Sequence, residues 1–61
     1  MAKDKNENFL KIGDSIKDKK GQVWKLTNIS GVSFGCRYDD HNRMVESKPY
    51  RKMDFSIMEK V

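Results

Sequence analysis

The segment from Val32 to Tyr38 places the strongest constraint on how this chain can fold. Its larger apolar residues, Val32, Phe34, Cys36 and Tyr38, occupy every second position. Side chains of a β-strand alternate between two faces, so this spacing predicts a strand with one apolar face. An isolated strand or hairpin cannot bury such a face stably, and the chain must supply other strands to pair with it.

Short apolar runs separated by turn residues predict four more strands. They open at Ile16 and cover residues 22–30, 44–48 and 55–61, with Phe55, Ile57 and Val61 facing inward in the last one. Pro49 ends the fourth strand, and residues 50–54 fit one tight helical turn before the fifth. Within 22–30 the apolar positions change parity after Leu26, which predicts a β-bulge near residues 27–28.

The chain is therefore expected to be all-β, because no window repeats its apolar residues with the period of a helix. Closing five short strands into a small barrel removes exposed sheet edges, which are prone to aggregation. We expect one five-stranded barrel domain over residues 9–61. Residues 1–8 are polar and charged, and they predict a disordered N-terminal tail.

Two motifs in the first half of the chain carry a family resemblance. Residues 11–16 read Lys-Ile-Gly-Asp-Ser-Ile, and residues 20–26 read Lys-Gly-Gln-Val-Trp-Lys-Leu. A Gly-Asp pair before a short strand, then a turn glycine before a second strand, resembles the opening of SH3-like barrels of the KOW and Tudor types. The resemblance implies a five-stranded barrel with a short helical turn before the last strand. Members of that group bind RNA, DNA, ribosomal or polymerase surfaces, or peptides, and the fold alone does not choose among these ligands.

The composition argues against an enzyme. A 61-residue chain with 36% hydrophobic residues has little apolar material for the deep cavity of a small-molecule site. Cys36 and His41 resemble a nucleophile and a base, but Cys36 shares its strand face with Phe34, which favours a buried structural cysteine. Residues 39–42 lack the ligand spacing of calcium and zinc sites. We expect no catalytic residue, metal, cofactor or small-molecule substrate.

The single cysteine and the lack of long apolar runs bear on location. Cys36 cannot form an internal disulfide, which fits a reducing compartment. The N-terminal residues do not resemble a signal peptide, and no apolar stretch approaches the ~20 residues that span a bilayer. We expect a cytoplasmic protein without a membrane partner.

The charge distribution favours a polyanionic partner. Thirteen Lys and Arg residues against nine Asp and Glu residues give a net charge of +4. The densest basic stretch contains Arg43, Lys48, Arg51 and Lys52. Such a stretch attracts phosphate groups, although a solvated face selected for solubility has the same composition. Lysines 17, 19 and 20 on the first hairpin are expected to aid solubility or to support the edge of a nucleic-acid surface.

Three aromatic residues complete a candidate nucleic-acid site. Trp24 is either a stacking platform for a base or a core residue. Tyr38 and Tyr50 either stack on bases or lie at strand ends with their hydroxyl groups exposed to solvent. The tyrosines neighbour Arg37 and Arg51, a combination that single-stranded nucleic-acid sites use. The predicted RNA- or DNA-binding residues are Trp24, Arg37, Tyr38, Arg43, Lys48, Tyr50, Arg51 and Lys52.

The alternative function is a protein-binding accessory module, an adaptor or inhibitor of a larger bacterial or phage-host enzyme. Three methionines are relevant to this alternative, Met44, Met53 and Met58. They either fill gaps in a small core or form an adaptable protein-binding surface.

Overall fold

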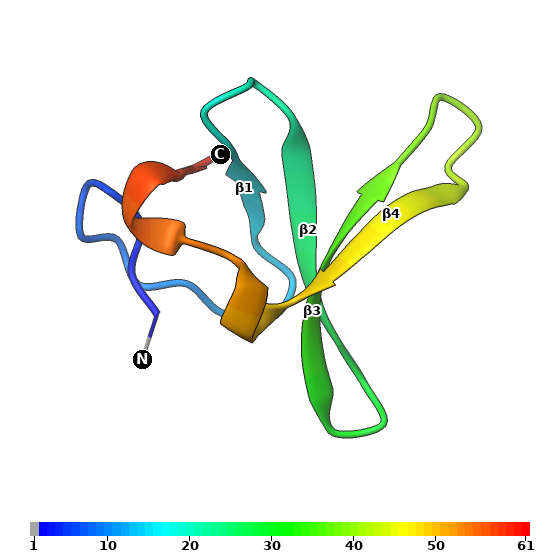
Figure 1. The fold of residues 1–61 in the computed structure, drawn as a ribbon, viewed down its shortest axis with the longest axis horizontal. Helices are drawn as coiled ribbons and strands as arrows, with labels where there is room; N and C mark the ends of the chain where they lie inside the picture. The colour runs from blue at the N-terminus through cyan, green and yellow to red at the C-terminus, as the bar shows by residue number, and fades with distance from the viewer. Residues whose placement is uncertain (1) are drawn as a thin grey trace.

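The computed structural model describes residues 2–61 as an all-β molecule (Figure 1). Its five strands are β1 (Ser15–Lys17), β2 (Val23–Ile29), β3 (Val32–Tyr38), β4 (Met44–Pro49) and β5 (Glu59–Lys60). They form one antiparallel sheet in the order β4-β3-β2-β1-β5. Two 3-10 turns, η1 (Tyr50–Lys52) and η2 (Phe55–Ile57), connect β4 to β5. The all-β prediction, the five strands and the helical turn after Pro49 are confirmed.

The sheet is open, and it is not closed into the barrel that we expected. β4 and β5 are its two edges, and the segment between them folds into η1 and η2 beside β1 (Figure 1). β5 has only two residues and pairs with β1. The exposed edge of β4 carries Lys48 and Pro49, which discourage pairing with another strand.

The last predicted strand is largely replaced by a turn. Residues 55–57 form η2 because the Asp54 carboxylate accepts a hydrogen bond from the backbone N–H of Ser56 at 3.2 Å, which caps the turn. Ile57 and Val61, expected to face inward, are 46% and 71% exposed, whereas Met58 is buried. Of the three residues predicted to face inward, only Phe55 packs against the core, and Met58 at the end of the turn is the buried residue of this segment.

The predicted bulge lies in a different place. The β2–β3 ladder runs without interruption from the pair Lys25 and Cys36 to the pair Ile29 and Val32. The register shift occurs in the β3–β4 ladder, between Arg37 and Tyr38. The parity change in β2 has another cause: its inward residues end at Leu26, and the strand then extends beyond the core into an exposed hairpin.

The core lies on one face of the sheet. Ile16 of β1 and Trp24 of β2 are cross-strand partners, and Leu26 follows Trp24 on the same face. They form one cluster with three other buried residues, Leu10, Met53 and Met58, against which Tyr50 and Phe55 pack. Two of the three methionines therefore fill the core, whereas Met44 is 55% exposed.

The N-terminal segment has a defined conformation in place of the predicted disorder. The carboxylate of Asp4, 4% exposed, accepts hydrogen bonds from the backbone N–H groups of Asn6, Asn8 and Lys60 at 2.8–2.9 Å. The backbone N–H of Lys5 also donates to the carbonyl of Met58 at 2.8 Å. These bonds tie residues 4–8 to the C-terminal segment, so the disorder prediction does not hold for residues 2–8. Met1 of the predicted tail lies outside the described residues.

Candidate functional site

Trp24 is a core residue. Its side chain is 2% exposed, and its indole N–H donates a hydrogen bond to Oδ2 of Asp18 at 3.0 Å. Arg37 and Lys48 place their cationic groups 5.4 and 5.1 Å from the ring centroid. A nucleic-acid base cannot stack on a ring that is already covered. Of the two interpretations of Trp24, the structure selects the core aromatic.

The two tyrosines do not form one surface with each other. Tyr38 pairs with Met44 near one end of the β3–β4 ladder, whereas Tyr50 follows Pro49 at the other end. Tyr38 is 44% exposed. Tyr50 is partly buried and meets Phe55 edge to face, with 5.1 Å between ring centroids. Burial, reinforced by the negative charge of Asp14, raises the pKa of the Tyr50 phenol.

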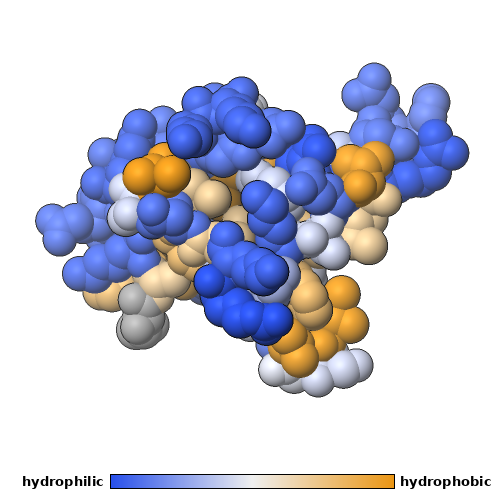
Figure 2. Space-filling view, in the orientation of Figure 1, coloured by the Kyte–Doolittle hydropathy of each residue, from blue (hydrophilic) through white to orange (hydrophobic). Residues whose placement is uncertain are grey.

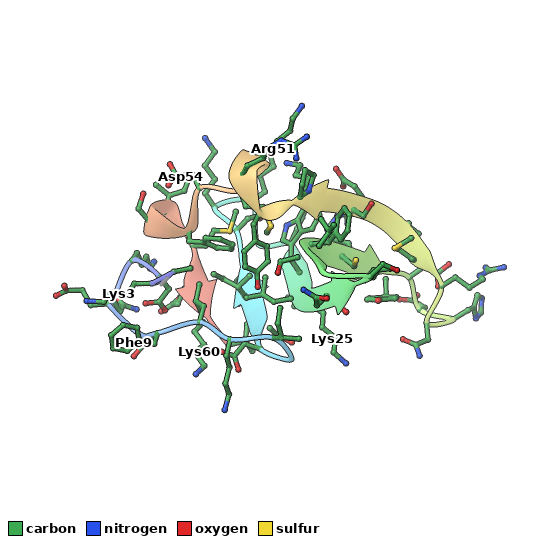
Figure 3. All side chains as sticks on the ribbon, turned by 90° about the horizontal axis from the view of Figure 1, so that it is seen from below. Lys3, Phe9, Lys25, Arg51, Asp54 and Lys60 are labelled. Carbon is green, nitrogen blue, oxygen red and sulfur yellow. The ribbon has the colours of Figure 1, made fainter. Side chains whose placement is uncertain are left out.

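Two of the predicted arginines are engaged within the protein. The guanidinium of Arg37 lies 2.8 Å from the Glu46 carboxylate, across the β3–β4 ladder. Arg43 pairs with Asp39 at 3.2 Å within the β3–β4 turn. Arg51 is exposed on η1 and points away from the sheet (Figure 3). The structure therefore divides the predicted basic stretch among several environments.

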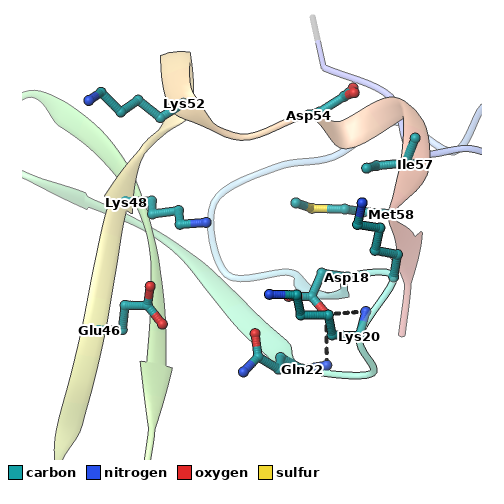
Figure 4. A pocket seen from close by; sticks show the side chains of 10 residues that line it. Asp18, Lys20, Gln22, Glu46, Lys48, Lys52, Asp54, Ile57 and Met58 are labelled. Carbon is teal, nitrogen blue, oxygen red and sulfur yellow. Dashed lines mark hydrogen bonds between the residues drawn. The ribbon is translucent and has the colours of Figure 1, made fainter.

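The lysines of that stretch line a groove with lysines from the first hairpin. Lys48 and Lys52 share a hollow of about 380 Å³ with Lys19 and Lys20 of the β1–β2 turn. Figure 4 shows Lys48 directed from β4 into this hollow and Lys52 at its rim. We call this hollow the lysine groove. Within residues 2–61, none of its four lysines forms an ion pair.

The carboxylates of the lysine groove are Asp18, Glu46 and Asp54, and each is already engaged. Asp18 accepts hydrogen bonds from Trp24 and from the backbone of Lys20 and Gln22, Glu46 pairs with Arg37, and Asp54 caps η2. Burial alone would raise the pKa of Asp18, but these donors outweigh it and lower that pKa. These contacts hold the acids in place, but each acid keeps its negative charge, so four lysines against three carboxylates leave the groove lining with a small positive excess.

Sequence reasoning gave Lys19 and Lys20 at most a supporting role. Lys19 and Lys20 come near Lys48 because β4, η2 and the β1–β2 turn border the same hollow, an arrangement that no local sequence pattern encodes (Figure 4). The turn itself was predictable from Gly21, whose φ of 81° lies in the left-handed region that glycine favours.

The outer face of the sheet, opposite the core, is apolar and exposed at the two ends of β3, whereas Cys36 between these ends is buried. Ile29 pairs with Val32 and Tyr38 pairs with Met44, and each of these side chains is 44–55% exposed. Val45, the extra residue at the register shift, is 54% exposed. Figure 2 shows hydrophobic surface over the β2–β3 and β3–β4 hairpins. These apolar side chains lie in two groups, at the start and at the end of β3.

Over the described part of the chain, no group of three His, Cys, Asp or Glu side chains is arranged to hold a metal ion. No helix among residues 2–61 is long and apolar enough to cross a bilayer. Comparison with protein-family models, curated proteins and solved structures finds no match for this chain. The lysine groove and the outer face are the two candidate binding surfaces of this chain.

Proposed function

We propose that this chain is a small non-enzymatic module that binds a nucleic acid, RNA or DNA, along the lysine groove. The observation that carries the proposal is the convergence of Lys19 and Lys20 with Lys48 and Lys52, from two distant segments, without ion pairs among residues 2–61. Ammonium groups of this kind bind phosphates and release counterions from the nucleic acid. The binding energy comes from the phosphate backbone, so little sequence specificity is expected.

Two features of the sequence support the same proposal. The net charge of +4 attracts polyanions over a longer range than the groove itself. Residues 11–26 resemble SH3-like modules, some of which bind RNA or DNA. A cytoplasmic location belongs to this proposal, because nucleic acid is available there and Cys36 is a free, buried thiol.

A salt titration tests the proposal. Binding of a labelled single-stranded oligonucleotide is measured by fluorescence anisotropy across salt concentrations for the wild type and for Lys48→Gln/Lys52→Gln. If both lysines contact phosphate, the slope of log affinity against log salt falls by about 1.4, or 0.7 per contact. The matched control is Lys11→Gln/Lys25→Gln, which removes the same charge at exposed positions outside the groove.

The wild type must bind in ~50 mM salt, where screening is weak. No binding under that condition, or equal losses in the two double variants, would contradict a nucleic-acid site in the lysine groove. Circular dichroism spectra of both variants check that the fold is retained.

The apolar outer face favours a second candidate function, binding of a larger protein such as a bacterial or phage-host enzyme. Ile29 and Met44, 53% and 55% exposed, would then contact that partner. A nuclease-treated pull-down with the wild type and with Ile29→Ser/Met44→Ser distinguishes the two functions. A partner that survives nuclease and high salt but is lost from this variant would support the second candidate.

A further inference from the structure

A second hollow adjoins the lysine groove. Its volume is about 370 Å³, and it shares Asp18, Lys19 and Ile57 with the groove. Lys5 and Lys17 line its far side. Because these three residues line both hollows, the two hollows are adjacent, and we call the boundary that the shared residues form the saddle.

The charges of the second hollow resemble those of the groove. Lys17 forms no ion pair with any other described residue. The ammonium of Lys5 lies 3.9 Å from Glu59, and both side chains are about half exposed, so water screens this pair. The remaining acid, Asp18, is held by Trp24 and the backbone of the β1–β2 turn. Phosphate groups would therefore meet at least two further available cations here.

The saddle between the hollows combines a charge with an apolar group. Lys19 contributes to both hollows, and Ile57 of η2 is 46% exposed beside it. A phosphodiester chain that crosses the saddle would keep a cation beneath its backbone throughout. Its bases would find an apolar side chain at the point where they leave one hollow for the next.

We propose that the nucleic-acid site continues from the lysine groove over Ile57 into the second hollow, and that its ligand is an extended single strand. This inference rests on the proposed function. A duplex is a stiff rod with a persistence length of about 150 base pairs, and it cannot bend into two small neighbouring hollows. A single strand is flexible enough to follow the path and can present its bases to Ile57.

The experiment uses one oligonucleotide of about 16 nucleotides, the upper range of single-module site sizes, as a single strand and as a duplex. Lys5→Gln/Lys17→Gln should reduce the single-strand salt slope by about 1.4, as expected for Lys48→Gln/Lys52→Gln, while Lys11→Gln/Lys25→Gln should not. Ile57→Ser should lower affinity about fivefold and leave the slope unchanged, because the lost contact is uncharged. The single strand should bind more tightly than the duplex.

The failure of this inference can be distinguished from the failure of the proposed function. If Lys5→Gln/Lys17→Gln behaves as the control while Lys48→Gln/Lys52→Gln weakens binding, the ligand stays in the groove and the extension is wrong. Duplex binding as tight as single-strand binding would also overturn the inference. If the wild type binds neither oligonucleotide, the proposed function is wrong and the inference falls with it.

Discussion

The indole N–H of Trp24 donates a hydrogen bond to Oδ2 of Asp18 at 3.0 Å, and this contact joins the core to the edge of the lysine groove. The other oxygen of Asp18 accepts from the backbone N–H groups of Lys20 and Gln22, both at 2.9 Å. One carboxylate thus fixes a buried ring and the turn that presents Lys19 and Lys20. The packing of Trp24 therefore helps to fix the shape of the lysine groove.

The first prediction concerns this contact. Asp18→Ala should destabilise the protein by about 1–3 kcal/mol, because the buried indole N–H and two backbone N–H groups of the turn lose their acceptor. Urea denaturation measures the change. Asp40→Ala removes the same charge from an exposed position in the β3–β4 turn and serves as the control. Equal midpoints for the two variants would show that the Trp24 hydrogen bond contributes nothing.

The second prediction concerns acid stability. Burial alone would raise the pKa of Asp4, but its bonds to Lys60, Asn8 and Asn6 lower it from 3.8 to about 2. The unfolded chain therefore binds more protons than the folded protein between these two values, so this stabilisation is present above the ordinary pKa. It is lost as the pH falls through about 2. The pKa values of Asp14, Asp18 and Asp39 are lowered as well. These three residues therefore also stabilise the folded protein above the ordinary pKa of an aspartate, and this stabilisation is lost in acid.

Unfolding curves between about pH 5 and pH 2 check this prediction. Asp4→Asn should be less stable than the wild type at pH 5, and the difference should narrow as the pH falls. Asp40→Asn, which also removes one carboxylate but at an exposed position, is the control. A constant difference between Asp4→Asn and the wild type at all pH values would contradict the linkage to Asp4.

The third prediction concerns Gly35, which is buried opposite Leu26. A Cβ atom on residue 35 would lie 2.5 Å from Sδ and 2.6 Å from Cε of Met53. Gly35→Ala should cost at most about 1 kcal/mol, because the atoms that must move are the flexible end of the Met53 side chain. A double-mutant cycle with Met53→Val measures the coupling, since valine lacks both contacting atoms. Additive effects of the two substitutions would contradict the packing of Met53 over Gly35.

The fourth prediction concerns the β2–β3 hairpin. Ser30 and Gly31 have φ angles of 53° and 84°, the two positive values of a type I′ turn. Asparagine tolerates this conformation better than serine, so Ser30→Asn should stabilise the protein by about 0.5 kcal/mol. Thermal unfolding measures the gain. Gly31→Ala in the same turn should destabilise it, and a gain there would argue against the left-handed turn.

The sequence alone determined the local features of this protein. Alternation from Val32 to Tyr38 and the turn residues around Gly21 and Gly31 were sufficient for three of the strands and their hairpins, because both signals act over a few residues. The single helical turn after Pro49 was also visible, since proline ends a strand. The positive charge of residues 43–52 was visible from composition, but its division among paired and free groups was not.

Only the tertiary structure decided which of these residues act together. Asp4 has no apolar neighbours in the sequence, yet backbone donors as distant as Lys60 make it a buried anchor. Lys19 and Lys48 are far apart along the chain, and they lie near each other because the β1–β2 turn and β4 border the same hollow. Trp24 was ambiguous until cross-strand pairing placed it inside. The physical reason is the same in each case: hydrogen bonds and packing between distant segments depend on where the sheet places them, and residue spacing does not specify that.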